Sequence, residues 1–414
     1  MPAKAIIISI GDEILYGQTL DTNSHWISGE LDNLGVRVLK KVTISDARET
    51  ILYNLQEAEK NADIVLITGG LGPTSDDLTK PCLAEYFGTQ LVRNEEAFAN
   101  IKAIFEKAGW EMNESNEQQA DLPANCTAIK NPIGTASGMW FDSNDKVIVS
   151  MPGVPFEMKH MMKETVLPRL KKQFVEDGIY HRMIRTIGIG ESKLAEIIKD
   201  WENKLPEEIK LAYLPTLGAV KLRLTTDNDS AQTKKQIQNL IDQVLPLIEK
   251  YVYGFDDEEV PEAIGRILRE KSQTLAIAES CTGGYLSHVV TSVPGSSGWF
   301  RGSMIPYSND LKRDLLAVDQ KILDAEGAVS EAVVLALAEN IRKSLKADVG
   351  ISVSGIAGPD GGSEEKPVGT VWIGYSDKNK SVAKKFRFIR NREINIKYSA
   401  IAALNMIRIN LDKD

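Results

Sequence analysis

The sequence predicts an α/β protein in which two three-layer α/β/α domains are joined by a small α+β module. At 414 residues, the chain is longer than a single hydrophobic core usually accommodates. Short apolar runs alternate with amphipathic stretches from the N-terminus to about residue 170, and again from Val260 onward. The segment between has a different pattern. We therefore expect domains at residues 1–168, 169–255 and 256–414.

The first domain shows regular strand–helix alternation. Its strands are rich in Ile, Val and Leu, which is typical of a parallel, doubly wound sheet buried on both faces. Ligands of such sheets bind at the carboxyl ends of the strands. The expected strands are residues 5–10, 36–44 and 63–70, and the expected helices are residues 23–35, 48–62 and 77–88.

The middle segment contains a strand-like alternation at Val220–Leu224, which indicates one exposed face. Two amphipathic stretches, 184–201 and 232–252, accompany it. The third domain returns to α/β alternation. Its expected strands are residues 274–280, 348–358, 370–376 and 381–388, and its expected helices are residues 261–272, 283–293, 330–347 and 393–411.

The composition excludes several classes of protein. Lys and Arg number 49 against 58 Asp and Glu, giving a net charge of −9, so we expect no general nucleic-acid binding. The three cysteines lack any CxxC spacing, which argues against a disulfide framework or structural zinc and favours a reducing compartment. No apolar run is long enough for a membrane span. We expect a cytoplasmic protein that does not bind membranes.

Two glycine-containing motifs follow strands in the first domain: residues 11–15 (GDEIL) and 68–79 (TGGLGPTSDDLT). Glycines let a backbone approach a ligand and present N–H groups to an anion, and carboxylates hold hard divalent metals. We expect a nucleotide or pterin phosphate site there. The simpler alternative is a loop with helix caps, since Asp76 and Asp77 are predicted to begin a helix. No GxGxxG motif follows the first strand, which disfavours a nicotinamide-dependent dehydrogenase.

A second glycine-dense loop, residues 354–362 (SGIAGPDGG), follows a strand of the third domain. Its glycine content exceeds what a turn requires, so an anion-binding loop is favoured over a purely structural one. Lys312, Lys366 and Arg392 are candidate sources of positive charge.

The stretch AESCTGG (278–284) places three side chains capable of nucleophilic attack directly after a strand. These groups need a base at neutral pH. The chain has only four histidines, and His288, the nearest, lies about two helical turns beyond Ser280. A Ser–Lys arrangement is the better chemical hypothesis, because YSNDLK (307–312) supplies a tyrosine and a lysine. The residues alone leave Ser280, Cys281 and Thr282 open.

These motifs resemble the family of the competence/damage-inducible protein CinA. The first two motifs and MPGVPFEM (151–158) resemble its N-terminal domain. AESCTGG, YSNDLK and the glycine loop that runs on to Trp372 look like its C-terminal domain, and GIGES (188–192) lies between them. The resemblance covers essentially the whole chain, in order.

The resemblance implies two activities and one module. The N-terminal domain would have a molybdopterin-binding-like fold with metal-dependent ADP-ribose pyrophosphatase activity, using Mg, Mn or Co. The C-terminal domain would be a nicotinamide mononucleotide deamidase of pyridine-nucleotide salvage that needs no cofactor. The middle module would be KH-type, and the protein would form a homodimer. A KH-type RNA site uses a GXXG loop, which GIGES does not match, so no strong nucleic-acid signal is present.

The site residues are carried over motif by motif. Ser280 would be the nucleophile, Lys312 its base and Tyr307 a supporting residue. The expected metal site consists of Asp12, Asp46, Asp76, Asp77 and Glu157. The expected substrate-binding residues are Thr282, Gly283, Gly284, Ser354, Gly355, Gly358, Gly361, Gly362 and Arg392 in the deamidase, and Gly69, Gly70, Gly72, Thr74 and Thr79 in the N-terminal domain.

Two stretches depart from the family's pattern, and both are expected near the deamidase pocket. Residues 301–306 end in Pro306, where the family continues a strand, and Arg390–Asn391 replaces a Gly-Asp pair before Arg392. The alternative from another functional class is a non-catalytic protein. It would bind a molybdopterin-like ligand or a partner in competence or DNA damage, with no turnover of either nucleotide.

Overall fold

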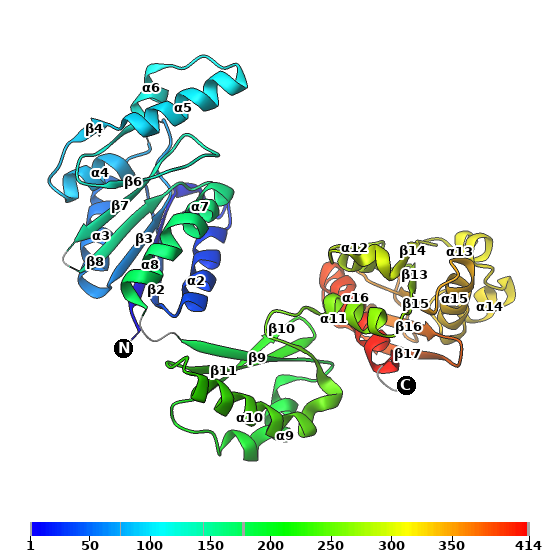
Figure 1. Cartoon of the computed structure of the whole chain (residues 1–414). Helices are drawn as coiled ribbons and strands as arrows, with labels where there is room; N and C mark the ends of the chain where they lie inside the picture. Colours follow the sequence, from blue (N-terminus) through cyan, green and yellow to red (C-terminus); the bar gives the residue numbers. More distant parts are fainter. Residues whose placement is uncertain (1, 75, 144, 176–178, 412–414) are drawn as a thin grey trace. The chain divides into compact units, whose positions relative to one another are not determined.

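The computed structural model describes residues 2–74, 76–143, 145–175 and 179–411. It divides the chain into two compact units. The first unit holds residues up to Tyr180 together with Thr226–Lys234, and the second holds His181–Thr225 and the rest of the chain. Figure 1 shows the elements of each. In the described part of the chain, no helix is long and apolar enough to cross a membrane.

The first unit contains a six-stranded sheet in the order β2-β1-β3-β8-β7-β6. The first four strands of that order are parallel. Three of them, β2, β1 and β3, are the expected strands, whereas β8 was not predicted, and the last two are antiparallel additions. A separate pair, β4 and β5, is antiparallel. The strands are β1 (Lys4–Ile10), β2 (Arg37–Ile44), β3 (Ile64–Thr68), β4 (Leu91–Arg93), β5 (Asp121–Pro123), β6 (Thr127–Ile129), β7 (Gly138–Ser143) and β8 (Lys146–Met151).

Helices cover both faces of this sheet because its strands are apolar on both sides. Along β1, Ile6, Ile8 and Ile10 pack with α3, α4 and α5 on one face, whereas Ala5 and Ile7 pack with α2, α7 and α8 on the other. The helices are α1 (Asp12–Leu15), α2 (Thr22–Leu34), α3 (Arg48–Asn61), α4 (Thr79–Tyr86), α5 (Glu95–Ala108), α6 (Glu114–Gln118), α7 (Pro155–Met161) and α8 (Leu167–Phe174), with a π-helical turn at Met162–Val166.

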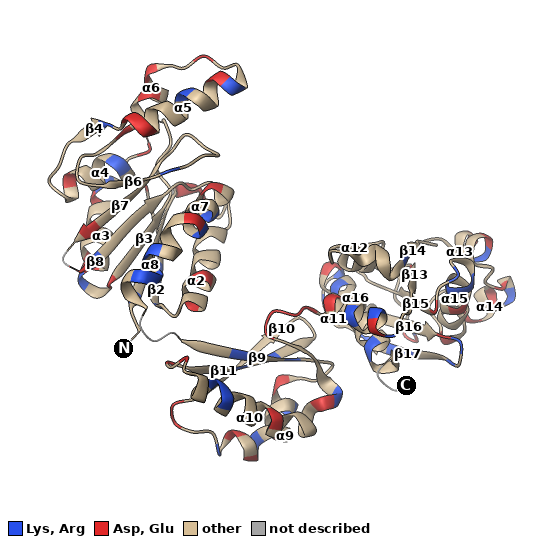
Figure 2. Cartoon of the chain, in the orientation of Figure 1, with Lys and Arg blue, Asp and Glu red and all other residues tan. Residues whose placement is uncertain are grey.

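The second unit begins with the middle module, a four-stranded sheet in the order β10-β11-β9-β12. Alternate residues of β11, including Leu222 and Leu224, are buried, which confirms the predicted one-sided strand. Both signs of charge occur along α9 and α10 (Figure 2). The elements are β9 (Tyr180–Ile187), α9 (Glu191–Glu202), β10 (Lys210–Thr216), β11 (Ala219–Thr226), α10 (Ala231–Ile248) and β12 (Val252–Phe255).

The remainder of the second unit is a five-stranded sheet in the order β14-β13-β15-β16-β17. One face packs against α11, α12 and α16 and the other against α13, α14 and α15, so this domain also has three layers. The elements are α11 (Val260–Glu270), β13 (Leu275–Glu279), α12 (Tyr285–Thr291), β14 (Phe300–Met304), α13 (Asn309–Leu316), α14 (Gln320–Glu326), α15 (Glu331–Ser344), β15 (Val349–Gly355), β16 (Thr370–Ser376), β17 (Ser381–Arg387) and α16 (Arg392–Leu411).

The middle module packs on α16 of this domain. Ile187, Ala219 and Tyr253 of the module belong to the same buried cluster as Leu404 of α16. The buried Arg408 donates hydrogen bonds to the Lys250 carbonyl at 2.8 Å and to the Val252 carbonyl at 3.1 Å. These contacts explain why the module and the C-terminal domain form one compact unit.

The packing of α11 gives a test of the second unit's core. A methyl group at the buried Gly265 would lie 2.8 Å from the Trp299 ring, whereas one at the exposed Gly29 of α2 would meet nothing within 4 Å. We predict that Gly265→Ala destabilises the second unit by about 1–3 kcal/mol through overpacking. Gly29→Ala is predicted to be neutral or to stabilise the first unit by up to about 1 kcal/mol. Urea unfolding of both variants measures the difference, and equal effects would contradict the predicted packing.

Candidate functional sites

The stretch from Glu279 to Gly284 forms a strand-to-helix turn between β13 and α12. Gly283 and Gly284 have φ angles of +58° and +99°, in the left-handed region that favours glycine. The Ser280 N–H donates to the Val353 carbonyl at 2.9 Å, which ties the turn to β15. The sequence pattern therefore predicted the local conformation correctly.

Lys312 of α13 lies against Ser280. Its side chain is 1% exposed, and its Nζ lies 3.2 Å from the Ser280 Oγ. The same nitrogen donates to the carbonyls of Pro306 at 3.0 Å and Tyr307 at 3.3 Å. Burial lowers the pKa of Lys312, and no carboxylate is among the groups that shift it. The structure thus brings together a hydroxyl and an amine that loses its proton more easily than an ordinary lysine.

The two carbonyls orient this amine. A neutral amine has two N–H groups and one lone pair. When Pro306 and Tyr307 accept the two N–H groups, the lone pair is left for the Ser280 hydroxyl proton. A buried, neutral lysine next to a serine can act as a general base. The geometry therefore suits a Ser–Lys pair without histidine.

Pro306, a departure from the family's pattern, has a clear place in this arrangement. It lies outside β14, which ends at Met304, so no strand bond is lost through its missing N–H. The Tyr307 N–H donates to the Ile305 carbonyl at 2.8 Å, closing a tight turn around Pro306. The carbonyl oxygens of Pro306 and Tyr307 both face Lys312.

The other two candidate nucleophiles, Cys281 and Thr282, have no comparable partner for their side chains. Cys281 is buried in the hydrophobic core, and burial raises the pKa of its thiol to about 12. Thr282 is 3% exposed, and its hydroxyl has no hydrogen-bond partner among the described residues. Of the three candidate nucleophiles, Ser280 alone has a side-chain hydrogen bond with the lysine in the described structure.

The glycine N–H groups of the turn bond within the protein. Gly283 N–H donates to the Ser280 carbonyl at 3.1 Å, and Gly284 N–H donates to the Glu279 carboxylate at 3.0 Å. Acceptors of the chain itself thus engage both N–H groups, and substrate binding by the two glycines stays a prediction. The left-handed φ angles show that the glycines shape the turn.

The N–H groups of Cys281 and Thr282 donate to no backbone carbonyl within the part of the chain that the structure describes. Cys281 and Thr282 directly follow Ser280 in the chain. In enzymes, the backbone N–H group of the residue after a nucleophile commonly donates to the oxyanion. Sequence reasoning missed these two donors, because it considered the side chains of both residues and the backbone of the glycines only.

Arg392 joins the glycine loop to the Ser–Lys pair. Its guanidinium donates to the Gly358 carbonyl at 2.8 Å and to the Tyr307 hydroxyl at 3.0 Å. The Asn391 side chain accepts the Ile394 N–H at 2.9 Å and so caps α16. Asparagine is as good a cap as aspartate, which explains why the second departure from the family's pattern leaves Arg392 in place.

The other loop residues have mainly structural contacts. The buried Ser354 hydroxyl donates to the Ala328 carbonyl at 2.7 Å. A Cβ at Gly355 would lie within 3 Å of Val371, and a Cβ at Gly358 or Gly362 would lie within 3 Å of Val368. Gly361 has a φ of +87° in the exposed part of the loop. Close packing explains much of the glycine content that the sequence suggested was for anion binding.

In the first unit, a cavity of about 460 Å³ opens at the carboxyl ends of β1, β3 and β8. Seven expected residues line it, together with Glu13, Asp21 and Asn23, which sequence reasoning missed. The seven are Gly69, Gly70, Gly72, Asp46, Asp76, Asp77 and Glu157. Asp12 lies beside the cavity, where its N–H donates to the Asp46 carboxylate at 3.1 Å.

Thr79 and Thr74 support the glycine loop and are not among the lining residues. The Thr79 hydroxyl donates to the Gly69 carbonyl at 3.0 Å, and its N–H donates to the Gly70 carbonyl at 3.2 Å. Thr74 donates its N–H to the Asp77 carboxylate at 3.0 Å. A Cβ at Gly69 would lie 2.1 Å from the Ile10 carbonyl oxygen, so glycine is required where β3 passes β1.

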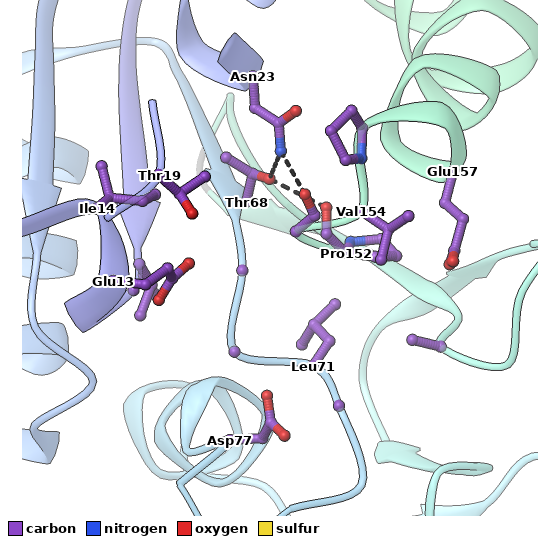
Figure 3. Close-up of a pocket in the computed structure, with 18 of the residues that line it drawn as sticks. Glu13, Ile14, Thr19, Asn23, Thr68, Leu71, Asp77, Pro152, Val154 and Glu157 are labelled. Atoms are coloured by element: carbon purple, nitrogen blue, oxygen red, sulfur yellow. Dashed lines mark hydrogen bonds between the residues drawn. The ribbon is translucent and has the colours of Figure 1, made fainter. Parts of the chain in front are cut away.

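Asp76 and Asp77 do not begin a helix, contrary to the prediction. Helix α4 starts at Thr79 with Leu78 as its N-cap, and the two carboxylates lie in the preceding turn. The reason is that Asp77 bonds back to Thr74. Asp77 therefore points into the cavity from the loop (Figure 3).

The carboxylates around the cavity repel one another. Burial raises the pKa of Asp46; the Asp12 N–H opposes this shift, and the charges of Asp12, Glu13 and Asp77 add to it. Burial also raises the pKa of Glu157, although Asn131 donates to its carboxylate at 2.6 Å. Figure 3 shows Glu13, Asp77 and Glu157 entering the cavity from three sides. Negative charge is thus concentrated without a cationic partner among the described lining residues.

Carboxylate oxygens are suitable ligands for a hard divalent metal ion, but the carboxylates here do not enclose a metal site by themselves. Among the described residues, no group of three or more His, Cys, Asp and Glu side chains is arranged to hold a metal ion. Mg²⁺ is commonly held by one or two carboxylates plus the phosphates of a substrate. Asp46 and Asp77 both line the cavity and their charges interact, so they are candidates for such a pair.

Asn23 connects the strand ends of this cavity. Its amide donates to the Thr68 hydroxyl at 3.0 Å and to the Gly153 carbonyl at 2.7 Å (Figure 3). These bonds join the loop after β3 to the MPGVPFEM loop after β8. The buried Asn23 therefore holds two of the sequence motifs in register.

Family models match the chain in three consecutive segments. Residues 6–172 match a probable molybdopterin binding domain, residues 181–254 the damage-inducible protein CinA KH domain, and residues 257–411 the CinA C-terminal domain. A CinA-like protein of Cytophaga hutchinsonii is 50% identical over 405 residues, covering 98% of this chain and 97% of that protein. The chain belongs to the CinA family.

Other relatives agree with this assignment. A CinA-like protein of Amoebophilus asiaticus is 40% identical over 406 residues, covering 97% of this chain and 98% of its own. A solved structure of a CinA protein from Thermoplasma acidophilum is 32% identical and covers 42% of this chain and 99% of that one, with a TM-score of 0.38. The family models and the two CinA-like relatives show the family, the molybdopterin-binding-like domain and the KH-type module that were expected from the motifs.

The raised pKa of Asp46 predicts a pH-dependent effect of Asp46→Asn. A carboxyl whose folded pKa exceeds its unfolded value contributes stability at low pH that is lost as the pH rises through the folded pKa. We predict that Asp46→Asn is more stable than the wild type in chelator, by a margin that grows from about pH 3 to about pH 7. Thermal unfolding of the first unit measures this margin. A margin that shrinks with rising pH would contradict the assigned repulsion.

Proposed function

We propose that the C-terminal domain hydrolyses the carboxamide of nicotinamide mononucleotide to a carboxylate and releases ammonia. The observation that carries this proposal is the buried Lys312 amine, 3.2 Å from the Ser280 hydroxyl and oriented by two carbonyls. An amide is hydrolysed by a serine only if its proton is removed and the oxyanion is stabilised. Both requirements have candidate groups here.

The proposed reaction has two halves. In the first, the Ser280 Oγ attacks the amide carbon as its proton passes to Lys312. The N–H groups of Cys281 and Thr282 stabilise the oxyanion, and Lys312 returns the proton to the departing ammonia. In the second half, Lys312 takes a proton from water, which attacks the ester carbon and releases the carboxylic acid with the proton restored to Ser280. The steps balance without a cofactor.

The mononucleotide's phosphate and ribose require separate recognition. Arg392 is the candidate, because it is exposed and is held at the edge of the site by the Gly358 carbonyl and the Tyr307 hydroxyl. A guanidinium binds phosphate through paired N–H donors. We propose that Arg392 and the loop from Gly355 to Gly362 bind the ribose phosphate.

We further propose that the N-terminal domain hydrolyses ADP-ribose to AMP and ribose 5-phosphate with the help of a divalent metal ion. The supporting observation is the charge of the cavity: carboxylates line it, and no Lys, Arg or His is among its described lining residues. A diphosphate would be repelled there unless cations accompany it. Asp46 and Asp77 would hold the metal, which would neutralise the diphosphate oxygens.

The deamidase proposal is tested by removing the nucleophile. We predict that Ser280→Ala lowers ammonia release from nicotinamide mononucleotide by at least about 1,000-fold. Cys281→Ala, which changes the adjacent buried side chain, is the matched control and should keep activity within about 10-fold of the wild type. A Ser280→Ala variant with near wild-type turnover would show that another group is the nucleophile. A wild type that binds the nucleotide without turnover would favour a binding protein.

The pyrophosphatase proposal is tested with Asp77→Asn. We predict that metal-dependent release of AMP from ADP-ribose falls by about 100-fold or more, because one of two metal-binding carboxylates is lost. Glu106→Gln, at an exposed position of α5, is the matched control and should have wild-type activity. AMP formation is measured by chromatography with and without chelator. Unchanged activity of Asp77→Asn would remove this residue from the proposed site.

A further inference from the structure

Glu279, the last residue of β13, is a buried carboxylate that the proposed reaction does not use. It is 0% exposed. One carboxylate oxygen accepts the N–H groups of Gly284 and Leu286, each at 3.0 Å. The other accepts the Ser287 N–H at 2.8 Å and the Ser287 hydroxyl. Four donors from the start of α12 therefore meet one side chain from the preceding strand.

Only a carboxylate satisfies this arrangement. Both of its oxygens are acceptors, whereas a glutamine would present an NH₂ group to two of the four donors. The first N–H groups of a helix lack partners within the helix. Gly284, the N-cap of α12, has no side chain to serve them. Glu279 takes over this capping function from the other side of the turn.

The capping bonds fix the nucleophile. Ser280 is held at one end of the turn by its N–H bond to Val353. The Glu279 carboxylate holds the far end, at the start of α12. Lys312 comes from a different helix, so the 3.2 Å contact with the Ser280 Oγ depends on a rigid turn. Small displacements of reacting groups cost large factors in rate.

The hydrogen bonds to Glu279 also determine which backbone N–H groups remain beside Ser280. The N–H groups of residues 284, 286 and 287 bind Glu279, and the Gly283 N–H binds the Ser280 carbonyl. The N–H groups of Cys281 and Thr282 donate to no backbone carbonyl within the described residues. Glu279 thus draws the later donors toward the core, while the first two stay beside Ser280.

We propose that Glu279 is a positioning residue of the Ser280 turn. Its carboxylate keeps the Ser280 Oγ in line with Lys312 and leaves the Cys281 and Thr282 N–H groups for the oxyanion. This inference rests on the proposed deamidase function. It assigns Glu279 no contact with the substrate, so its loss should affect the rate of the chemical step and not the affinity for the nucleotide.

The test uses the full-length chain with Glu279→Gln, and Ser287→Ala as the matched control. We expect Glu279→Gln to lower kcat for nicotinamide mononucleotide by about 100-fold while KM stays within about 3-fold. Hydrogen–deuterium exchange in a peptide spanning Ser280–Val290 should become faster, with β16 unchanged. Ser287→Ala removes one of four donors and should lower kcat by less than about 5-fold.

Each outcome decides the inference. Unchanged exchange, an unchanged kcat, or a loss confined to KM would overturn it. If Glu279→Gln does not fold, Glu279→Asp, which keeps the charge but is one methylene shorter, is read by the same measurements. A wild type that releases no ammonia would refute the deamidase proposal, and the exchange measurement would then decide by itself whether Glu279 holds the turn.

Discussion

The burial of the Lys312 amine is the constraint on which the C-terminal domain depends. A buried basic nitrogen must find hydrogen-bond acceptors in place of water. Here two carbonyls of the turn around Pro306 accept its N–H groups, and the hydroxyl of Ser280 lies 3.2 Å from the nitrogen. Strand β14 must therefore end before Pro306, and α13 must start soon after it, with Ser308 as its N-cap. The turn after β13 must also bring the Ser280 hydroxyl within hydrogen-bond distance of Lys312.

Two buried groups of opposite character hold the nucleophile's turn. Glu279 is surrounded by donors, and Lys312 is surrounded by acceptors. Each is satisfied by neutral groups of the chain, with no salt bridge between them. The N-terminal cavity is the opposite case, because burial, together with the charges of neighbouring carboxylates, raises the pKa of Asp46. The proposed deamidase reaction uses the chain's own groups, whereas the proposed pyrophosphatase reaction also uses a divalent cation.

Much of the fold follows from local patterns. The apolar strands of the first domain and the amphipathic helices between them were predicted, because burial on both faces leaves a clear sequence pattern. The antiparallel strands β6 and β7 and the parallel strand β8 were not among the predicted strands. The start of α4 was misplaced because an aspartate favours a helix cap and a turn alike, and Asp77 bonds back to Thr74.

The sequence by itself determined the domain types, the three candidate nucleophiles and the lysine that could activate one of them, because motif spacing and hydrophobic period are local properties. Only the tertiary structure decided that Ser280 contacts Lys312, which lies 32 positions away, and that Glu279 binds the helix N–H groups. It also decided that the N–H groups of Gly283 and Gly284 bond to acceptors of the chain itself. Hydrogen-bond donors are assigned by whichever acceptor is nearest in space, and that distance is set by the packing of strands and helices from separate parts of the chain.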